Sequence, residues 1–174
     1  MTLLTCQWDG GPGRLNEQTY RHLVSLAGKH PRLLLEVGGE ERLQESLHST
    51  HDWLWRRYLE DLPDKLKQAE HLPETLDRGH GNLAADLAFS WRATGADSLY
   101  EAARDYLIRL CQHEVWDPEY DLLHGHLLLG SAIAYDWLYP HLSRAQRTTL
   151  AARIGDEAEM QYRQIAHNRA WYRN

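Results

Sequence analysis

The sequence predicts an all-α protein, an incomplete (α/α) toroid built of stacked helical hairpins. Residues 121–139 have the length of a helix and are apolar on all sides, which indicates a buried helix. This helix and the apolar one expected at 82–94 are each followed, after a short connection, by an amphipathic helix, at 143–166 and 98–113. Such hairpins stack into an inner layer covered on both sides and an outer layer with one wet face. No segment alternates with period two for long enough to predict a sheet.

Composition limits the classes of function. The chain has 174 residues with 19 basic and 25 acidic side chains, a net charge of -6 and no basic block, so we expect no nucleic-acid partner. Cys6 and Cys111 cannot make a disulfide framework. The apolar run at 121–139 is interrupted by His124, His126 and Asp136 and falls short of the about 20 apolar residues that cross a bilayer, so we expect no membrane partner.

Residues 1–20 bear on the compartment of the protein. Residues 1–20 hold no apolar run long enough for a signal peptide, so the chain as written is expected to be cytoplasmic. If a leader has been removed, a periplasmic or secreted location is expected instead.

The chain divides into two parts near residue 29. Residues 1–29 are expected to form an N-terminal arm and a short helix, because Asp9-Gly-Gly-Pro-Gly13 breaks regular structure and Asn16 can cap a helix that runs to about Ala27. Residues 30–174 are expected to form the N-terminal portion of the toroid domain. Its first residues should be extended, because Pro31 disfavours the helical conformation of His30.

Turn and capping residues place the helix ends. A helix is predicted from about Glu40, with a break at Pro63 and a loop over residues 71–81, after which Asn82 caps the first inner helix. Ser98-Leu-Tyr-Glu101 and Ser143-Arg-Ala-Gln146 have the form of capping boxes that open the two outer helices.

Two or three hairpins would make only an arc of a closed ring. An arc leaves apolar surface of its inner helices uncovered. We therefore expect something to cover it: a C-terminal part beyond residue 174, another partner, or self-association.

Several segments carry a resemblance to a known family. His30-Pro-Arg-Leu-Leu, Asn82-Leu-Ala with Thr94-Gly95, and Ala134-Tyr-Asp-Trp-Leu-Tyr139 with Leu142-Ser and Arg147 resemble the N-terminal part of the heparinase II/III-like polysaccharide lyases. That family is related to alginate lyases and dermatan sulfate epimerases, and the resemblance covers roughly residues 30–174. It implies an (α/α) toroid followed by β-sandwich domains. It also implies chemistry at C5 of a uronic acid, in which His or Tyr removes a proton while donors neutralise the carboxylate.

The resemblance also bears on activity. In the family the catalytic Asn, His and Tyr residues come after the helix that ends near residue 174. We therefore expect an N-terminal fragment of a lyase that acts by β-elimination on uronic-acid-containing polysaccharides, inactive alone and without a catalytic residue of its own. Three alternatives stay open: an (α/α) toroid glycoside hydrolase with Glu119 and Asp121 as its acids, a uronate C5-epimerase, and a non-catalytic helical interaction module.

The expected partner is an acidic polysaccharide or oligosaccharide, and eight residues are candidates to bind it. Asn82, His124 and His126 lie near the starts of inner helices, which face the cleft in such toroids. Aromatic side chains at loop positions could stack on sugars, and two polar residues lie nearest the expected catalytic segment. The remaining candidates are Trp116, Trp171, Tyr172, Arg173 and Asn174. Asn82 could equally be a simple N-cap, and either histidine could be a hydrogen-bonded core residue.

No metal or cofactor site is predicted. His124 and His126 are two residues apart, so on a helix they point about 200° away from each other and cannot easily reach one ion. The glycine-rich stretch at residues 9–13 lacks the lysine and following helix of a phosphate-binding loop.

Overall fold

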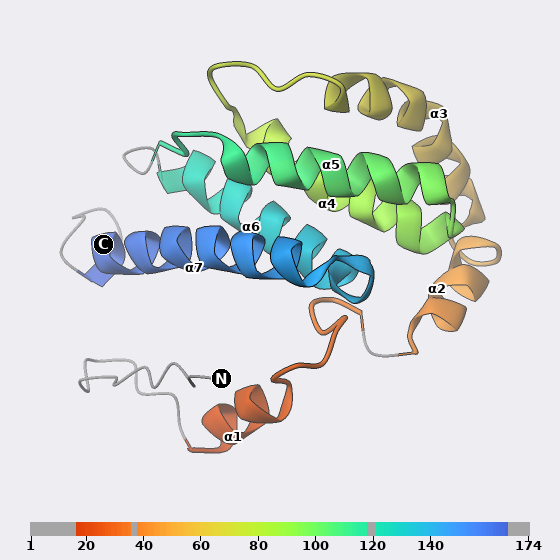
Figure 1. The fold of residues 1–174 in the computed structure, drawn as a ribbon. Coiled ribbons are helices and arrows are strands. Elements are labelled where there is room, and N and C mark those ends of the chain that lie inside the picture. Colours follow the sequence, from red (N-terminus) through yellow and green to blue (C-terminus); the bar gives the residue numbers. More distant parts are fainter. Residues whose placement is uncertain (1–16, 36–37, 118–120, 167–174) are drawn as a thin grey trace, which may run out of the picture.

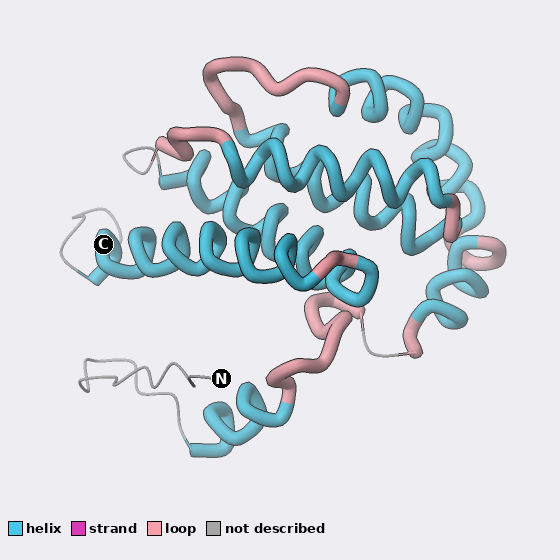
Figure 2. The backbone as a smooth tube through the Cα atoms, in the orientation of Figure 1, coloured by secondary structure: helices cyan, strands magenta, loops and turns pink. Residues whose placement is uncertain are grey.

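The computed structural model describes residues 17–35, 38–117 and 121–166, and the regular structure within them is helical throughout (Figures 1 and 2). The all-α prediction is confirmed. The helices in chain order are α1 (Glu17–Ser25), α2 (Glu40–Leu47), α3 (Asp52–Ala69), α4 (Arg78–Thr94), α5 (Asp97–Gln112), α6 (Asp121–Leu138), the short 3-10 helix η1 (Tyr139–His141) and α7 (Arg144–Ala166). Within these ranges no helix is long and apolar enough to cross a bilayer.

Two layers of helices enclose the main core. α4 packs most extensively against α6, and α5 and α7 lie side by side across this pair (Figure 1). Leu87 of α4, Leu107 of α5 and Leu127 of α6 are completely buried between the layers. The two predicted pairs of successive helices are both present, as α4–α5 and α6–α7.

Two glycines allow α4 and α6 to touch through their backbones. A Cβ atom added at Gly130 would lie 1.8 Å from the carbonyl oxygen of Gly81, and one added at Gly81 would lie 2.1 Å from the carbonyl oxygen of His126. Carbon atoms cannot approach oxygen so closely, so neither position tolerates a side chain without moving a helix. This contact also brings the residue after Gly81, Asn82, next to His126.

The predicted start of α4 was wrong by about one turn. α4 begins at Arg78, and its N-cap is Asp77, whose side chain accepts a hydrogen bond from the Gly79 N–H at 2.7 Å. The Asp77 N–H in turn donates to Nδ1 of His80 at 2.9 Å. In this capping box a histidine occupies the position that usually holds Glu or Gln, so the usual sequence motif of a helix start is absent here. Asn82 consequently lies in the second turn of α4 and is not its cap.

Two other helix boundaries differ from the sequence prediction. Pro63 lies inside α3 and does not end it. Pro63 lacks the N–H group that would donate to the carbonyl group of Leu59, a residue on the exposed side of α3. α5 begins at Asp97 after Ala96, without the expected side-chain cap from Ser98.

The capping box at the start of α7 is confirmed. The Ser143 N–H donates to Oε1 of Gln146 at 2.8 Å, and the Gln146 N–H donates to Oγ of Ser143 at 3.2 Å. The connection between α6 and α7 is thereby fixed at the position that the sequence predicts.

The glycine contact predicts opposite effects of alanine at two glycines of α6. Gly130→Ala should lower the free energy of unfolding by about 1–3 kcal/mol, because its methyl group would press α6 away from α4. Gly125→Ala is the matched control. Its added Cβ meets nothing within 4 Å, so the better helix propensity of alanine should raise stability by about 1 kcal/mol. Urea unfolding followed by circular dichroism measures both, and equal effects would contradict the close approach of the two helices.

Candidate functional site

Asn82 and His126 lie together on α4 and α6. Nδ1 of His126 is 3.0 Å from Oδ1 of Asn82, although 44 residues separate them in the sequence. A carbonyl oxygen carries no hydrogen, so the Nδ1–H of the imidazole is the donor. Among the sequence-predicted site residues that the structure describes, these two are joined by a hydrogen bond.

The Asn82–His126 pair lies on an open and partly apolar surface. Asn82 is exposed and the His126 side chain is half-buried. Leu122 and Leu129 stand one turn before and one turn after His126 on α6, and they are 48% and 61% exposed. These two leucines give the surface of α6 around His126 its apolar character.

His124 points away from this surface into the core. It is completely buried, with Nε2 at 2.7 Å from Oε2 of Glu157 and Nδ1 at 2.5 Å from Oε1 of Gln161. Arg153 forms an ion pair with the other oxygen of Glu157 at 2.8 Å. Both ring nitrogens are therefore engaged with α7, so His124 joins α6 to α7 and does not lie beside Asn82.

The tryptophan candidate in the described residues is also a core residue. Trp116 is 1% exposed, its indole N–H donates to the carbonyl oxygen of Leu110 at 3.0 Å, and Arg153 lies over its ring. The other four predicted site residues, Trp171, Tyr172, Arg173 and Asn174, lie outside the described residues.

A buried carboxylate connects the segments that carry the family resemblance. Asp136 accepts hydrogen bonds from Nδ1 of His30 at 2.6 Å and from the backbone N–H groups of Arg32 and Leu33 at 2.7 and 2.8 Å. It is 2% exposed, so these three donors replace the water that a carboxylate requires. We call this cluster the Asp136 latch, because it fastens residues 30–33 to the end of α6.

Aromatic side chains complete the Asp136 latch. The His30 ring stacks on Tyr139 with centroids 3.7 Å apart, and the Trp137 indole N–H donates to the carbonyl oxygen of Leu33 at 2.7 Å. Arg147 of α7 donates to the Tyr139 carbonyl at 2.9 Å and lies over its ring. These residues come from segments that are far apart in the sequence, and in the structure they form one cluster.

Burial lowers the pKa of His30, an effect that outweighs the opposing influence of the Asp136 carboxylate. The imidazole is therefore neutral in the latch, with its Nδ1–H donated to Asp136.

The lowered pKa of His30 predicts a loss of stability in acid. Between the folded-state pKa and the ordinary value of 6.5, the unfolded chain binds a proton at His30 that the folded chain does not. The contribution of His30 to stability is therefore complete above pH 6.5 and declines as the pH falls below that value. Urea unfolding at several pH values measures the slope, and His30→Gln should make it shallower. An unchanged slope in this variant would contradict a neutral His30 in the latch.

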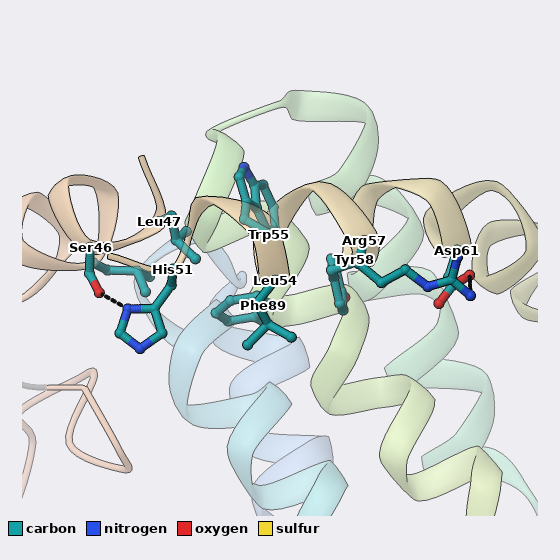
Figure 3. Close-up of a pocket in the computed structure, with 10 residues that line it drawn as sticks. Ser46, Leu47, His51, Leu54, Trp55, Arg57, Tyr58, Asp61 and Phe89 are labelled. Carbon is teal, nitrogen blue, oxygen red and sulfur yellow. Dashed lines mark hydrogen bonds and ion pairs between the residues drawn. The ribbon is translucent and has the colours of Figure 1, made fainter. Parts of the chain in front are cut away.

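A separate pocket lies between α2, α3 and α4 (Figure 3). Its volume is about 530 Å³ and its walls are mostly apolar. Trp55 and Tyr58 of α3 stack with centroids 5.5 Å apart, and Phe89 of α4 meets both rings edge-on. Leu47 and Leu54 add further apolar wall. A pocket of this size and lining suits a small apolar molecule.

Polar groups of this pocket are engaged with the protein. The Tyr58 hydroxyl donates to the carbonyl oxygen of Asp86 at 2.8 Å, and burial raises its pKa to about 12, so it stays protonated. At the rim Arg57 pairs with Asp61 and with Glu60. Sequence reasoning missed this pocket. The spacing of Trp55 and Tyr58 on one face of α3 was the available signal, but nothing pointed to Phe89 as their neighbour.

Within the described residues, no group of three or more His, Cys, Asp or Glu side chains is arranged to hold a metal ion. No protein-family model matches the sequence, and the search of curated proteins finds no match either.

Proposed function

We propose that this chain forms part of the substrate-binding wall of an (α/α) toroid polysaccharide lyase of the heparinase II/III-like type. Its substrate would be a uronic-acid-containing polysaccharide. The observation that carries the proposal is the Asn82–His126 pair on the open surface of α4 and α6.

The chemistry of this surface fits a sugar chain. Sugars present hydroxyl groups around the ring edge and C–H groups on the ring faces. The carboxamide of Asn82 and the imidazole of His126 provide hydrogen-bonding groups for the edge. Leu122 and Leu129 provide exposed apolar contacts for a ring face.

The Asp136 latch supports the resemblance without supplying chemistry. His30, Asp136, Tyr139 and Arg147 come from the segments that carry the resemblance, and they form one connected cluster. Their occurrence together in one sequence thus has a structural reason, because each side chain contacts another member.

In the proposed reaction a base removes the C5 proton of the uronate while hydrogen-bond donors neutralise its carboxylate. The electron pair of the broken C–H bond forms the C4–C5 double bond, and the 4-linked sugar leaves with its oxygen. The resemblance assigns the role of the base to none of residues 1–174. The proposal therefore gives the described surface the role of holding the sugar chain.

A second candidate function is a helical interaction module. The exposure of Leu122 and Leu129 favours it, because apolar side chains exposed on one face of a helix are a feature of surfaces that bind other proteins.

Polysaccharide binding tests the first proposal. A uronate polymer and heparan sulfate should retard the chain in affinity electrophoresis more strongly than neutral dextran does. Asn82→Ala and His126→Ala should each weaken binding about tenfold, equivalent to about 1.4 kcal/mol.

Two exposed residues elsewhere serve as matched controls. Gln68→Ala removes a carboxamide from α3 and His71→Ala removes an imidazole from the loop after it, and both should leave binding unchanged. The proposal is contradicted if neither acidic polymer binds, or if the controls weaken binding as much as the two test variants.

A further inference from the structure

We propose that Asn82 is a positioning residue that holds His126 in the tautomer protonated on Nδ1. Nε2 then presents a lone pair to the open surface, where it accepts a hydrogen bond from a sugar hydroxyl group. The choice of a sugar as ligand rests on the proposed function, whereas the tautomer rests on the hydrogen bond alone.

The hydrogen bond between the two side chains decides the tautomer. Oδ1 of Asn82 has lone pairs and no hydrogen, so at 3.0 Å it can pair with Nδ1 of His126 only when that nitrogen carries a proton. In a neutral imidazole the other nitrogen is then bare. The opposite orientation of the carboxamide, with its NH₂ group toward the ring, would select the opposite tautomer, so the two arrangements differ measurably.

The backbone contact between the helices holds this pair in place. Gly81 lies against the carbonyl group of His126, as close as a glycine allows, and Asn82 is the next residue. The positions of the two side chains are thus set by packed backbones of α4 and α6. Asn82 lies in the second turn of α4 with no capping duty, since Asp77 and His80 perform that role.

Nε2 of His126 remains available to a ligand. In the described part of the chain no group forms a hydrogen bond with it, and its neighbours along α6, Leu122 and Leu129, have apolar side chains. His124 differs in this respect, because its two ring nitrogens face Glu157 and Gln161 in the core.

The chemistry of the pair selects hydroxyl groups over carboxylates. A bare Nε2 accepts a hydrogen bond from an O–H group and repels the lone pairs of a carboxylate. The NH₂ group of Asn82 can donate to a neighbouring oxygen while its Oδ1 stays bonded to the ring. An acceptor beside a donor complements two adjacent hydroxyl groups of a sugar, so the carboxylate of an acidic sugar must be bound by other groups.

The tautomer is tested by nitrogen-15 NMR of the chain labelled at histidine, at a pH above the titration range of imidazole. The His126 signals are identified by their loss in His126→Gln. We expect Nδ1 at the shift of a protonated ring nitrogen and Nε2 at that of a bare one. Asn82→Ala should move His126 toward the Nε2-protonated form that free imidazole side chains favour, and Asn82→Asp, which keeps the oxygen acceptor, should restore the Nδ1-protonated form.

The signals of His124 report on folding in the same spectra. They should stay unchanged in both Asn82 variants, because His124 bonds to α7 on the other side of α6. An Nε2-protonated His126 in the unaltered chain would overturn the proposal. The proposal is also overturned if Asn82→Ala leaves the His126 tautomer unchanged while the His124 signals show that the protein is folded.

Titration with two oligosaccharides tests the ligand class. A neutral cello-oligosaccharide and a glucuronic-acid oligomer present similar hydroxyl groups and differ in the carboxylate. A shift of the His126 Nε2 signal with either oligomer, lost in Asn82→Ala, supports the proposal, and the absence of a shift with both overturns its hydroxyl-binding part. A response to the neutral oligomer alone would refute the acidic substrate of the proposed function and leave the role of Asn82 standing.

Discussion

The contact between the backbones of α4 and α6 is the constraint on which the candidate site depends. Gly81 and Gly130 remove the side chains that would keep the helices apart, and each faces a carbonyl group of the other helix. Without this approach, two short side chains on separate helices could not meet. The same contact anchors the most extensive helix pairing of the core, so the geometry of the surface and the packing of the interior have one origin.

The two histidines of α6 lie on opposite sides of the helix, one in the core and one at the surface. His124 and His126 point in nearly opposite directions because each residue turns the helix by about 100°. His124 is enclosed by Glu157 and Gln161 of α7, and its burial requires these partners. Among the described residues His126 is hydrogen-bonded to Asn82 alone, and in our proposal its Nε2 faces the open surface.

Hydrophobic periodicity predicts the helical class and the inner and outer character of the later helices, and the Ser-x-x-Gln motif predicts the capping box of Ser143 and Gln146. Predictions failed where an unusual residue performs a familiar role, as His80 does in the cap of α4, and where exposure permits an irregularity, as at Pro63. The aromatic pocket and the Asn82–His126 bond depend on residues far apart in sequence. The spacing of residues along one helix shows which face of that helix each occupies, but it does not show which residues of other helices pack against that face.

The Asp136 latch has a consequence for the order in which the protein folds. The acceptor for the His30 imidazole and for two backbone N–H groups is more than 100 residues further along the chain. Contacts with such long separations carry a large loop-closure entropy and form after local ones. During synthesis on the ribosome, residues 30–33 therefore cannot bind Asp136 until α6 has emerged. A segment that is synthesised early thus reaches its final packing late.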